Sequence, residues 1–284
     1  MTAHLIGLIG AGIGSSLSPA LHEREAQHHG LRYLYKILDI SELGVDAAAA
    51  GDLVRTARRV GYTGLNITHP CKQTVIEHLD ELSPDAARLG AVNTVTFDGD
   101  RAIGHNTDWT GFAESFARGL PDAATRRVVQ VGAGGAGAAV AHALLTMGAD
   151  QVTLVDTRTA RADALAAQLT RHFGPGRARS APVADLAASL RHADGLVNAT
   201  PIGMSGHPGS PVPADLLRPD LWVADVVYRP LRTELLEQAR AAGCRTLDGG
   251  GMVVFQAAHA FRLFTGLTPD TDRMLAHLSA LVAA

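Results

Sequence analysis

The sequence predicts an α/β protein of two domains, in which short buried strands alternate with helices in largely parallel sheets. Apolar runs of strand length alternate with stretches at helical spacing along most of the chain. A pattern of strand, glycine-rich turn and helix begins anew after residue 126. The 284 residues suffice for two medium domains, and 46% hydrophobic with 19% charged residues is typical of a folded chain.

The first part of the chain is expected to contain three strands and a β-hairpin. The strands are "LIGLIG" (5–10), "YLYKILDI" (33–40) and "GLNIT" (64–68). The hairpin is "AVNTVTFDGDRAIGHNTD" (91–108). Its two alternating runs meet at Asp98-Gly99-Asp100, a suitable turn sequence.

Helices are expected between these strands and at the end of the chain. One begins with Ser18 as N-cap and Pro19 at its first position, and an alanine-rich helix covers about residues 45–60. Residues 251–266 and 271–284 form two last helices with no strand after them. Such a pair can pack back on the first domain, which would make that domain discontinuous.

The second part of the chain reads as a further series of strands and helices. "RRVVQVGAGGAGAAVAHALLTMGA" (126–149) gives a strand, a glycine turn and a helix. The later strands are "QVTLVD" (151–156), "GLVNATP" (195–201), "LWVADVVY" (221–228) and "RTLDG" (245–249), and the later helices are "TARADALAAQL" (159–169) and "TELLEQARAAG" (233–243).

Composition excludes several classes of protein. A net charge of −3 and a pI near 6.5 give no electrostatic basis for binding nucleic acid or an anionic membrane. No apolar run approaches the ~20 residues that span a bilayer, and the N-terminus lacks the pattern of a signal peptide. Cys71 and Cys244 lie outside any CxxC pattern, and the thirteen histidines lack metal-ligand spacing. We expect a cytoplasmic protein without disulfide or metal.

The glycine turn predicts a dinucleotide site. Gly132, Gly134 and Gly137 stand in GxGxxG order, directly after a strand and at the start of a helix. The first permits the tight turn, the second lets the backbone approach a pyrophosphate, and the third allows close packing of helix and strand. N–H groups at the helix start then hold the phosphates. The fold prediction is therefore a Rossmann domain at 111–249, with an open α/β substrate domain formed by 1–110 and 250–284.

Asp156 at the end of the next strand favours NAD over NADP. It lies 24 residues after Gly132 (156 − 132), where a carboxylate can accept hydrogen bonds from the ribose hydroxyls of NAD. It would repel the 2′-phosphate of NADP by up to ~4 kcal/mol at intermediate dielectric, less in salt. Arg158 and Arg161 follow closely and could offset this repulsion.

Polar residues gather at the expected strand ends of the first domain. Strand ends are where open α/β sheets bind ligands, so hydroxyls and amides there predict a site for a polyhydroxylated molecule. The residues are Ser16, Ser18, Asn66, Thr68, Lys72, Asn93, Asn106 and Asp108. Taken singly, most have a structural explanation: Ser18 as an N-cap, Thr68 as a cap, Asn93 and Asn106 as turn residues, and Lys72 as a solvated lysine. Their combination beside a nucleotide site favours a ligand.

These motifs make the sequence resemble the shikimate dehydrogenase family. The resemblance runs nearly end to end. The matching segments are "SLSP" (16–19), "NITHPCK" (66–72), "AVNT" (91–94), "NTDWTGF" (106–112), "GAGGAG" (132–137), "NATPIGM" (198–204), "DVVYRP" (225–230) and "GGGMVVFQA" (249–257). It implies reversible hydride transfer between a nicotinamide and a ring alcohol, shikimate or quinate, in the shikimate pathway of aromatic amino acid biosynthesis or in quinate catabolism.

The resemblance also implies the site residues. The catalytic pair would be Lys72 and Asp108. The substrate would be bound by Ser16, Ser18, Asn66, Thr68, Lys72, Asn93, Asp108, Tyr228 and Gln256, with the two serines on its carboxylate. The cofactor would be bound by Gly132, Ala133, Gly134, Gly135, Ala136, Gly137, Asp156, Thr157, Arg158, Arg161, Thr200, Pro201, Met204, Val226, Gly249 and Met252, with Met204 and Gly251 along the nicotinamide.

Departures from the family pattern bear on specificity. The NADP-dependent biosynthetic members usually carry an Asn-Arg-Thr segment where this chain has Asp156-Thr157-Arg158, which favours the NAD-dependent quinate/shikimate branch. Ser18 stands where some of that branch have threonine, so shikimate and quinate both stay open. Alternatives are an NADP-dependent biosynthetic enzyme, an aminoshikimate-type relative, and a catalytically silent regulator that binds NAD and a shikimate-like acid. A monomer or a homodimer is expected.

Lys72 is expected to be a charged donor rather than a simple base. Pairing with Asp108 would hold the ammonium form, although burial would act against it. We expect Lys72 to stabilise the developing alkoxide and relay its proton, while Asp108 hydrogen-bonds the substrate hydroxyl and orients the lysine. Lys72 falls in the first turn of the expected helix, where the helix dipole disfavours a cation.

Overall fold

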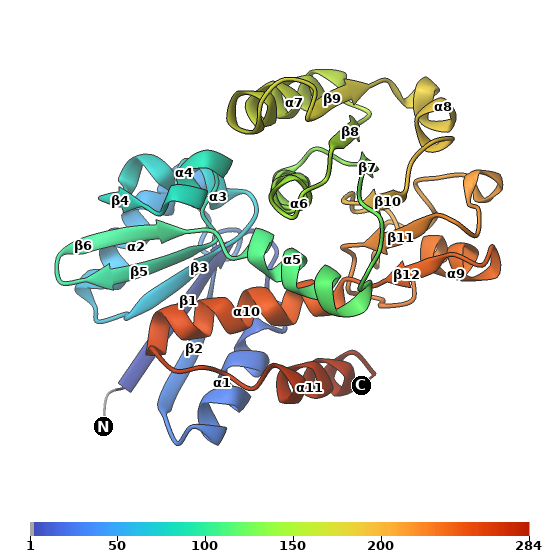
Figure 1. Ribbon diagram of the computed structural model, residues 1–284. Coiled ribbons are helices and arrows are strands. Elements are labelled where there is room, and N and C mark those ends of the chain that lie inside the picture. The colour runs from blue at the N-terminus through green and yellow to red at the C-terminus, as the bar shows by residue number, and fades with distance from the viewer. Residues whose placement is uncertain (1–2, 284) are drawn as a thin grey trace. The chain divides into compact units, whose positions relative to one another are not determined.

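The computed structural model describes residues 3–283, which form two compact units (Figure 1). Unit 1 contains the chain up to Thr107 and the segment from Val254 onward, and unit 2 contains Asp108–Val253. The sequence pattern placed the two changes at 110/111 and 249/250. Each unit is built on one six-stranded sheet with helices, so the α/β class with two domains is confirmed.

The sheet of unit 1 brings five chain segments to one edge. Its strand order is β2-β1-β3-β5-β6-β4. The strands are β1 (Ala3–Gly10), β2 (Arg32–Asp39), β3 (Gly64–Ile67), β4 (Glu81–Leu82), β5 (Thr94–Asp98) and β6 (Arg101–His105). Strands β1, β2 and β3 run parallel, whereas β5 is antiparallel to both β3 and β6. The carboxyl ends of β1, β2, β3 and β6 therefore meet the amino end of β5 at the same edge.

The predicted hairpin is confirmed as β5 and β6. Asp98 pairs with Arg101, and Gly99 between them has a φ of 55°, a left-handed conformation that glycine adopts without steric cost. The two-residue strand β4 was not predicted. It forms by pairing with β6, at Glu81 with Ile103 and Leu82 with Gly104, which is a non-local contact that no local pattern announces.

The helices of unit 1 fill the expected intervals with some different starts. They are α1 (Ser18–His28), η1 (Ala47–Ala49), α2 (Ala50–Arg59), α3 (Cys71–Thr74), η2 (Ile76–His78), α4 (Pro84–Leu89), α10 (Gly250–Thr265) and α11 (Thr271–Ala283). The prediction of Ser18 as an N-cap is wrong: the helix starts at Ser18, Leu17 is the N-cap, and no side chain caps it. Pro19 does lie in the first turn. The side chain of Asp46 instead caps η1, and that of Ser83 caps the unpredicted α4.

The two C-terminal helices complete unit 1, as the sequence suggested. Ala260 and Phe264 of α10 share a buried cluster with Ile6, Leu8 and Tyr35 from the first two strands. A Cβ on Gly64 of β3 would lie 2.4 Å from the Phe264 ring, so this glycine admits the aromatic side chain against the sheet. Residues of α10, near the end of the chain, therefore form part of the hydrophobic core around the first strands.

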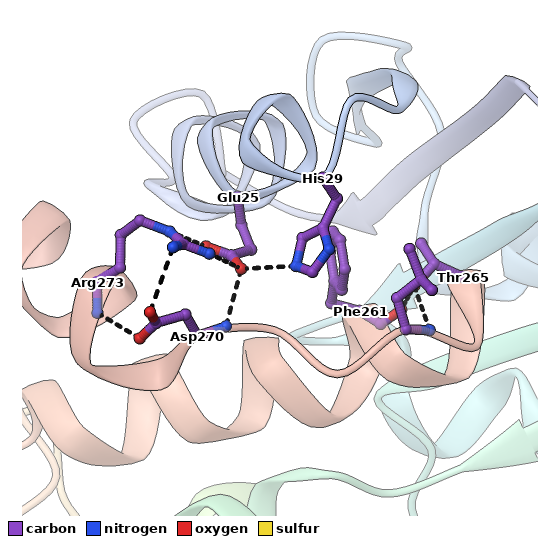
Figure 2. A network of polar contacts seen from close by, with 7 residues as sticks. Glu25, His29, Phe261, Thr265, Asp270 and Arg273 are labelled. Carbon is purple, nitrogen blue, oxygen red and sulfur yellow. Dashed lines mark hydrogen bonds and ion pairs between the residues drawn. The ribbon is translucent and has the colours of Figure 1, made fainter.

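Glu25 of α1 ties that helix to the C-terminal segment (Figure 2). Its side chain is 1% exposed, and Arg273 of α11 donates from Nη2 to Oε1 at 2.6 Å and from Nε to Oε2 at 2.9 Å. The Asp270 N–H donates to Oε1 at 2.8 Å, and His29 Nε2 lies 3.0 Å from the same oxygen. Burial alone would raise the pKa of Glu25, but these donors hold the pKa below its usual value.

Unit 2 is a doubly wound sheet in which every strand pairing is parallel. The strand order is β12-β11-β10-β7-β8-β9. The strands are β7 (Arg127–Val131), β8 (Gln151–Val155), β9 (Ala178–Ala181), β10 (Gly195–Asn198), β11 (Trp222–Asp225) and β12 (Arg245–Leu247). Counted from β7, the order is 3-2-1-4-5-6, so the direction of winding reverses between β7 and β10. Ligands bind such sheets beyond the carboxyl ends of the strands at that point.

The helices of unit 2 cover an alanine-rich core. They are α5 (Asp108–Gly119), α6 (Gly135–Thr146), α7 (Thr159–Phe173), η3 (Val183–Asp185), α8 (Leu186–Leu190), η4 (Ala214–Leu216) and α9 (Glu234–Ala241). Strand β9 and helix α8 were not predicted. Ala139, Ala141 and Ala143 of α6 are almost fully buried, because small side chains let that helix approach the sheet closely.

Two general features hold for residues 3–283. None of the helices there has the length and apolar character needed to cross a membrane. Within the same range, no group of three or more His, Cys, Asp or Glu side chains could hold a metal ion. Cys71 and Cys244 are both free and buried, and burial raises the pKa of each thiol.

Candidate active site

Loops of unit 1 are joined by backbone hydrogen bonds where its strand ends meet. After β1, Ala11 N donates to His69 O at 2.9 Å, which binds the first loop to the loop after β3. Val92 N donates to Lys72 O at 2.8 Å, which binds the same region to the segment before β5. The predicted substrate residues Ser16, Thr68, Lys72 and Asn93 therefore lie on segments that are tied to one another.

The loop that carries Ser16 and Ser18 is held by Asp39, a residue that sequence reasoning missed. Asp39 ends β2, and its carboxylate accepts from Gly12 N at 2.9 Å, Ile13 N at 2.7 Å and Ser41 N at 3.0 Å. Burial alone would raise the pKa of Asp39, but the three N–H groups hold the pKa below its usual value. The signal was available, since Asp39 ends an apolar strand as Asp156 does.

The two serine hydroxyls lie beside each other in this loop. Ser16 Oγ is 3.3 Å from Ser18 Oγ, and Ser18 N donates to Ser16 Oγ, also at 3.3 Å. Ser16 N donates to Ile13 O at 2.9 Å, so the turn held by Asp39 leads directly into the serine pair. Both serines are half-buried, which leaves them partly accessible to a ligand.

Asn66 is buried in β3, and its amide is used within the protein. Its Oδ1 accepts from the Tyr35 hydroxyl at 2.8 Å. Its Nδ2 donates to Asn93 O at 3.2 Å and to Thr94 Oγ1 at 3.1 Å. Both N–H groups are thus taken, and only Oδ1 keeps a free lone pair. Burial raises the pKa of Tyr35, which keeps its hydroxyl a donor. No local pattern indicates Tyr35 as the partner of Asn66.

Asn93 fixes the segment that leads to Asp108. Its Oδ1 accepts from Thr107 N at 2.8 Å, and its Nδ2 donates to Thr107 Oγ1 at 2.9 Å. Asn106 Nδ2 donates to Ala91 O at 3.0 Å. These are turn-holding contacts, the structural role considered for both asparagines. Asp108 follows as the buried first residue of α5.

Lys72 lies on a helix of a single turn, α3, and is half-buried. Lys72 is the second residue of α3, so its expected place in the first turn is confirmed, and the dipole penalty on its charge stays a prediction. Thr68 does not cap this helix through its side chain. Its carbonyl accepts from Cys71 N at 2.8 Å, and Pro70 is the N-cap.

The remaining predicted substrate residues are divided between the units. Gln256 lies on α10 and belongs to unit 1. The two serines, Thr68 and Lys72 belong to the same unit. Tyr228 and Asp108 both belong to unit 2. Tyr228 lies in the loop after β11, and burial raises the pKa of its hydroxyl.

The glycine turn of unit 2 packs tightly against backbone at Gly132 and Gly137 and faces open space at Gly134 and Gly135, as a dinucleotide requires. Gly132 has a φ of 101°, and a Cβ there would lie 2.5 Å from Ala199 O. A Cβ on Gly137 would lie 2.4 Å from Gly132 O. Above the turn the space is open: a Cβ on Gly135 would meet nothing within 4 Å, and one on Gly134 only Arg161 Nη1 at 3.8 Å. The twelve-residue helix α6 starts there, so its first N–H groups suit a pyrophosphate.

Asp156 holds the glycine turn from the side of β8. Its Oδ2 accepts from Ala133 N at 2.9 Å and its Oδ1 from Arg158 N at 2.8 Å. The carboxylate is 9% exposed, and each oxygen keeps a lone pair for a further donor. Thr157 and Arg158 are exposed beside it, and Arg161 is half-buried.

A second polar network orders the loops after β10 and β11. Asn198 Nδ2 donates to Asp225 Oδ1 at 2.9 Å and to Ile202 O at 3.0 Å, and Thr233 Oγ1 donates to Asp225 Oδ2 at 2.7 Å. Burial raises the pKa of Asp225 despite these donors. Thr200 joins the network through Asn198 Oδ1 at 2.7 Å. Asn198 and Asp225 were within quoted motifs, but the sequence did not indicate their positioning role.

The other predicted cofactor residues differ in exposure. Met204 is 40% exposed and Pro201 is exposed, which leaves both accessible. A Cβ on Gly249 would lie 2.4 Å from Val226 O, so the β12–α10 connection passes close to the loop after β11. Met252 is 9% exposed and packs in the core of unit 2.

Comparisons with known proteins agree on the family. Three family models match: "Shikimate dehydrogenase substrate binding domain" over residues 8–95, "Shikimate 5'-dehydrogenase C-terminal domain" over 249–278, and "Saccharopine dehydrogenase NADP binding domain" over 128–207.

Similar proteins carry two cofactor names. A shikimate dehydrogenase (NADP(+)) of Streptomyces avermitilis is 67% identical over 98% of this chain and 96% of its own. A quinate/shikimate dehydrogenase (NAD(+)) of Corynebacterium efficiens is 48% identical over 98% of both chains. The structure of quinate dehydrogenase from Corynebacterium glutamicum in complex with NAD has a TM-score of 0.93 at 45% identity, covering 98% of this chain and 99% of that one. The chain belongs to the shikimate dehydrogenase family of nicotinamide-dependent oxidoreductases.

Proposed function

We propose that this protein catalyses the reversible NAD-dependent oxidation of shikimate to 3-dehydroshikimate, of quinate to 3-dehydroquinate, or of both. The reaction class follows from the family. The choice of NAD rests on one observation, the Asp156 carboxylate held at the end of β8 by Ala133 N and Arg158 N. A carboxylate fixed there can accept from ribose hydroxyls and repels a 2′-phosphate. A cytoplasmic location remains part of the proposal.

Unit 2 is proposed as the cofactor domain. The glycine turn from Gly132 to Gly137 would hold the pyrophosphate through the N–H groups at 134–136, because those of Gly132 and Ala133 donate to Val155 O and Asp156 Oδ2. Asp156 would bind the adenosine ribose. Thr157, Arg158 and Arg161 would border the adenosine, and Thr200, Pro201, Met204, Val226, Gly249, Gly251 and Met252 would lie toward the nicotinamide. When bound, the nicotinamide supplies or accepts the hydride. The open space over Gly134 and Gly135 supports this assignment.

Unit 1 is proposed to bind most of the substrate. The Ser16 and Ser18 hydroxyls would donate to the substrate carboxylate, and their neighbouring Oγ atoms support a shared ligand. Thr68, Asn93 and Gln256, with Tyr228 of unit 2, would bind the ring hydroxyls. Asn66 has spent both N–H groups internally, so we propose that it acts mainly by orienting Asn93 and Thr94 and accepts a substrate hydroxyl through Oδ1.

Lys72 and Asp108 are proposed as the catalytic pair. Asp108 would accept the hydrogen bond of the reacting hydroxyl and orient the lysine. Lys72 would stabilise the alkoxide that develops as hydride leaves and pass on its proton.

A second candidate, an NADP-dependent shikimate dehydrogenase, is favoured by one specific finding. The Streptomyces avermitilis relative that shares 67% of its residues with this chain is named for NADP(+). The exposed Arg158 and the half-buried Arg161 could place guanidinium groups against a 2′-phosphate and offset the charge of Asp156.

A kinetic matrix of shikimate and quinate against NAD and NADP tests the proposal. The reaction is measured by the absorbance of the reduced nicotinamide, and we expect the largest kcat/KM with NAD. A larger kcat/KM with NADP would overturn the inference from Asp156 and favour the second candidate. Absence of turnover in all four pairs, with dinucleotide binding retained, would favour the silent regulator.

A further inference from the structure

Gln130 is a fully buried polar residue in the middle of an apolar parallel strand. Strand β7 reads Arg-Val-Val-Gln-Val, and its glutamine is 0% exposed, where such strands carry almost only apolar residues. The Oε1 atom has no hydrogen-bond partner among residues 3–283. A buried amide with an unpaired oxygen is costly, so a compensating contact is expected on its other atom.

That contact is to the glycine turn. Gln130 Nε2 donates to Gly132 O at 2.8 Å and to Gly137 O at 2.9 Å. Exchanging the amide oxygen and nitrogen would point Oε1 at two carbonyl oxygens, so the bonding pattern itself settles the orientation. Both N–H groups are used, on two acceptors that belong to the same turn.

The two acceptors are the carbonyls of the first and last glycine of the GxGxxG motif. One side chain therefore closes the turn across its base, from the strand that leads into it. Asp156 holds the same turn from β8 through Ala133 N. A Cβ on Gly137 would come within 2.9 Å of Gln130 Nε2, so glycine is required there partly to admit the amide.

We infer that Gln130 is a positioning residue for the dinucleotide: it sets the spacing of the glycine turn and so aims the N–H groups at residues 134–136 toward the pyrophosphate. The inference rests on the proposed function of this turn. Gln130 itself has no route to the cofactor, because it is buried and both its donors are taken. Replacing Gln130 is expected to change the affinity for the dinucleotide and not the KM for the substrate.

Gln130→Met tests the inference. Methionine has a similar length and no amide, so it removes both donors together with the unpaired oxygen and suits the apolar strand. We expect the Kd for NADH and for NAD, measured by fluorescence titration and calorimetry, to rise about tenfold. A rise of this size corresponds to the net contribution of one hydrogen bond. The KM for shikimate at saturating dinucleotide and the melting temperature should stay near those of the natural protein.

Thr153→Val is the matched control. Thr153 is a buried polar residue of the neighbouring strand β8, and its Oγ1 accepts from Arg179 Nε at 3.0 Å. This variant also removes a side-chain hydrogen bond from the sheet but does not touch the glycine turn, so its dinucleotide Kd should be unchanged. Gln130→Asn, too short to reach both carbonyls, should weaken binding as Met does and serves if the Met variant does not fold.

Two results would overturn the inference. One is an unchanged dinucleotide Kd in folded Gln130→Met or Gln130→Asn. The other is an equal rise in Kd in Thr153→Val, which would indicate a general loosening of the sheet. If the natural protein bound neither NAD nor NADP, the proposed function itself would fail, and that result is read from the natural protein alone.

Discussion

At the scale of single residues, Asp156 holds the glycine turn and is proposed to select the cofactor. It accepts from Ala133 N and Arg158 N, so its replacement alters the glycine turn as well as the charge at the ribose. Asp156→Asn should raise the ratio of kcat/KM with NADP to that with NAD by roughly ten- to a hundredfold, because the repulsion is removed. The Kd for NAD should also rise, about tenfold, because an amide N–H would face one of the two backbone donors.

Asp150→Asn is the control for this change. Asp150 is an exposed carboxylate immediately before β8, whereas Asp156 comes immediately after β8. The control should leave both cofactor preference and Kd unchanged. A ratio that does not move in Asp156→Asn would mean that this carboxylate does not face the ribose.

Lys72 is chemically distinctive within this chain. Of its 25 lysine and arginine residues only two are lysines, Lys36 and Lys72. Arginine serves as a fixed charge but does not give up a proton, so a proton relay needs the lysine. Lys72→Met should lower kcat by ~10²–10⁴ with little change in KM, the range of a positioned acid–base group.

Lys36→Met supplies the comparison, because Lys36 is exposed on β2. Steady-state kinetics of both variants at saturating dinucleotide would decide. Near-normal kcat in Lys72→Met would remove Lys72 from the catalytic pair.

At the scale of elements, the loop between β1 and α1 depends on the end of β2. Asp39→Asn would turn an amide N–H toward Ile13 N and release the turn that leads to Ser16. We expect the KM for shikimate to rise about tenfold with kcat and dinucleotide Kd unchanged. Asp46→Asn, in the exposed cap of η1, should leave KM as it is. Equal effects in both variants would contradict a special role for Asp39.

The pH dependence of stability follows from the same carboxylate. Because the folded-state pKa of Asp39 lies below its usual value, its contribution to stability is complete above the unfolded-state pKa of ~3.9 and is lost as pH falls through the folded-state value. The difference in urea midpoint between the natural protein and Asp39→Asn should thus be present near pH ~7 and shrink below pH ~4. A difference that grew in acid would contradict this assignment.

At the scale of the whole molecule, residues 248 positions apart are joined by the Glu25–Arg273 pair (Figure 2). Arg273→Met would leave a buried carboxylate without its cation. The free energy of unfolding should fall by about 3 kcal/mol, as measured by urea denaturation.

Two variants accompany this measurement. Glu25→Gln combined with Arg273→Met should recover part of the loss, since no buried charge then stays unpaired. Arg240→Met breaks an exposed pair with Glu237 on α9 and should cost less than ~0.5 kcal/mol. If Arg273→Met cost no more than Arg240→Met, the buried pair would not be a main link of unit 1.

Most of the fold was predictable because its signals are local. Alternating apolar runs indicated the strands, and Gly132, Gly134 and Gly137 indicated the turn of unit 2. Local signals did not indicate β4, which exists through its pairing with β6, nor the start of α1, where Pro19 suggested a capping serine. The candidate site residues stay predictions, although Ser16, Thr68, Lys72 and Asn93 lie on segments that backbone hydrogen bonds join.

The sequence by itself determined the α/β class and the glycine turn, because each depends on neighbours a few positions away. Only the tertiary structure decided which polar side chains support the site from behind. Asp39 reaches Gly12, Tyr35 reaches Asn66, and Asp156 reaches Ala133 across gaps of more than twenty residues. Even Gln130, close in sequence to its acceptors, is turned toward Gly137 only because β7 and α6 pack together. Hydrogen bonds of this kind depend on how strands lie side by side, which no spacing along the chain reveals.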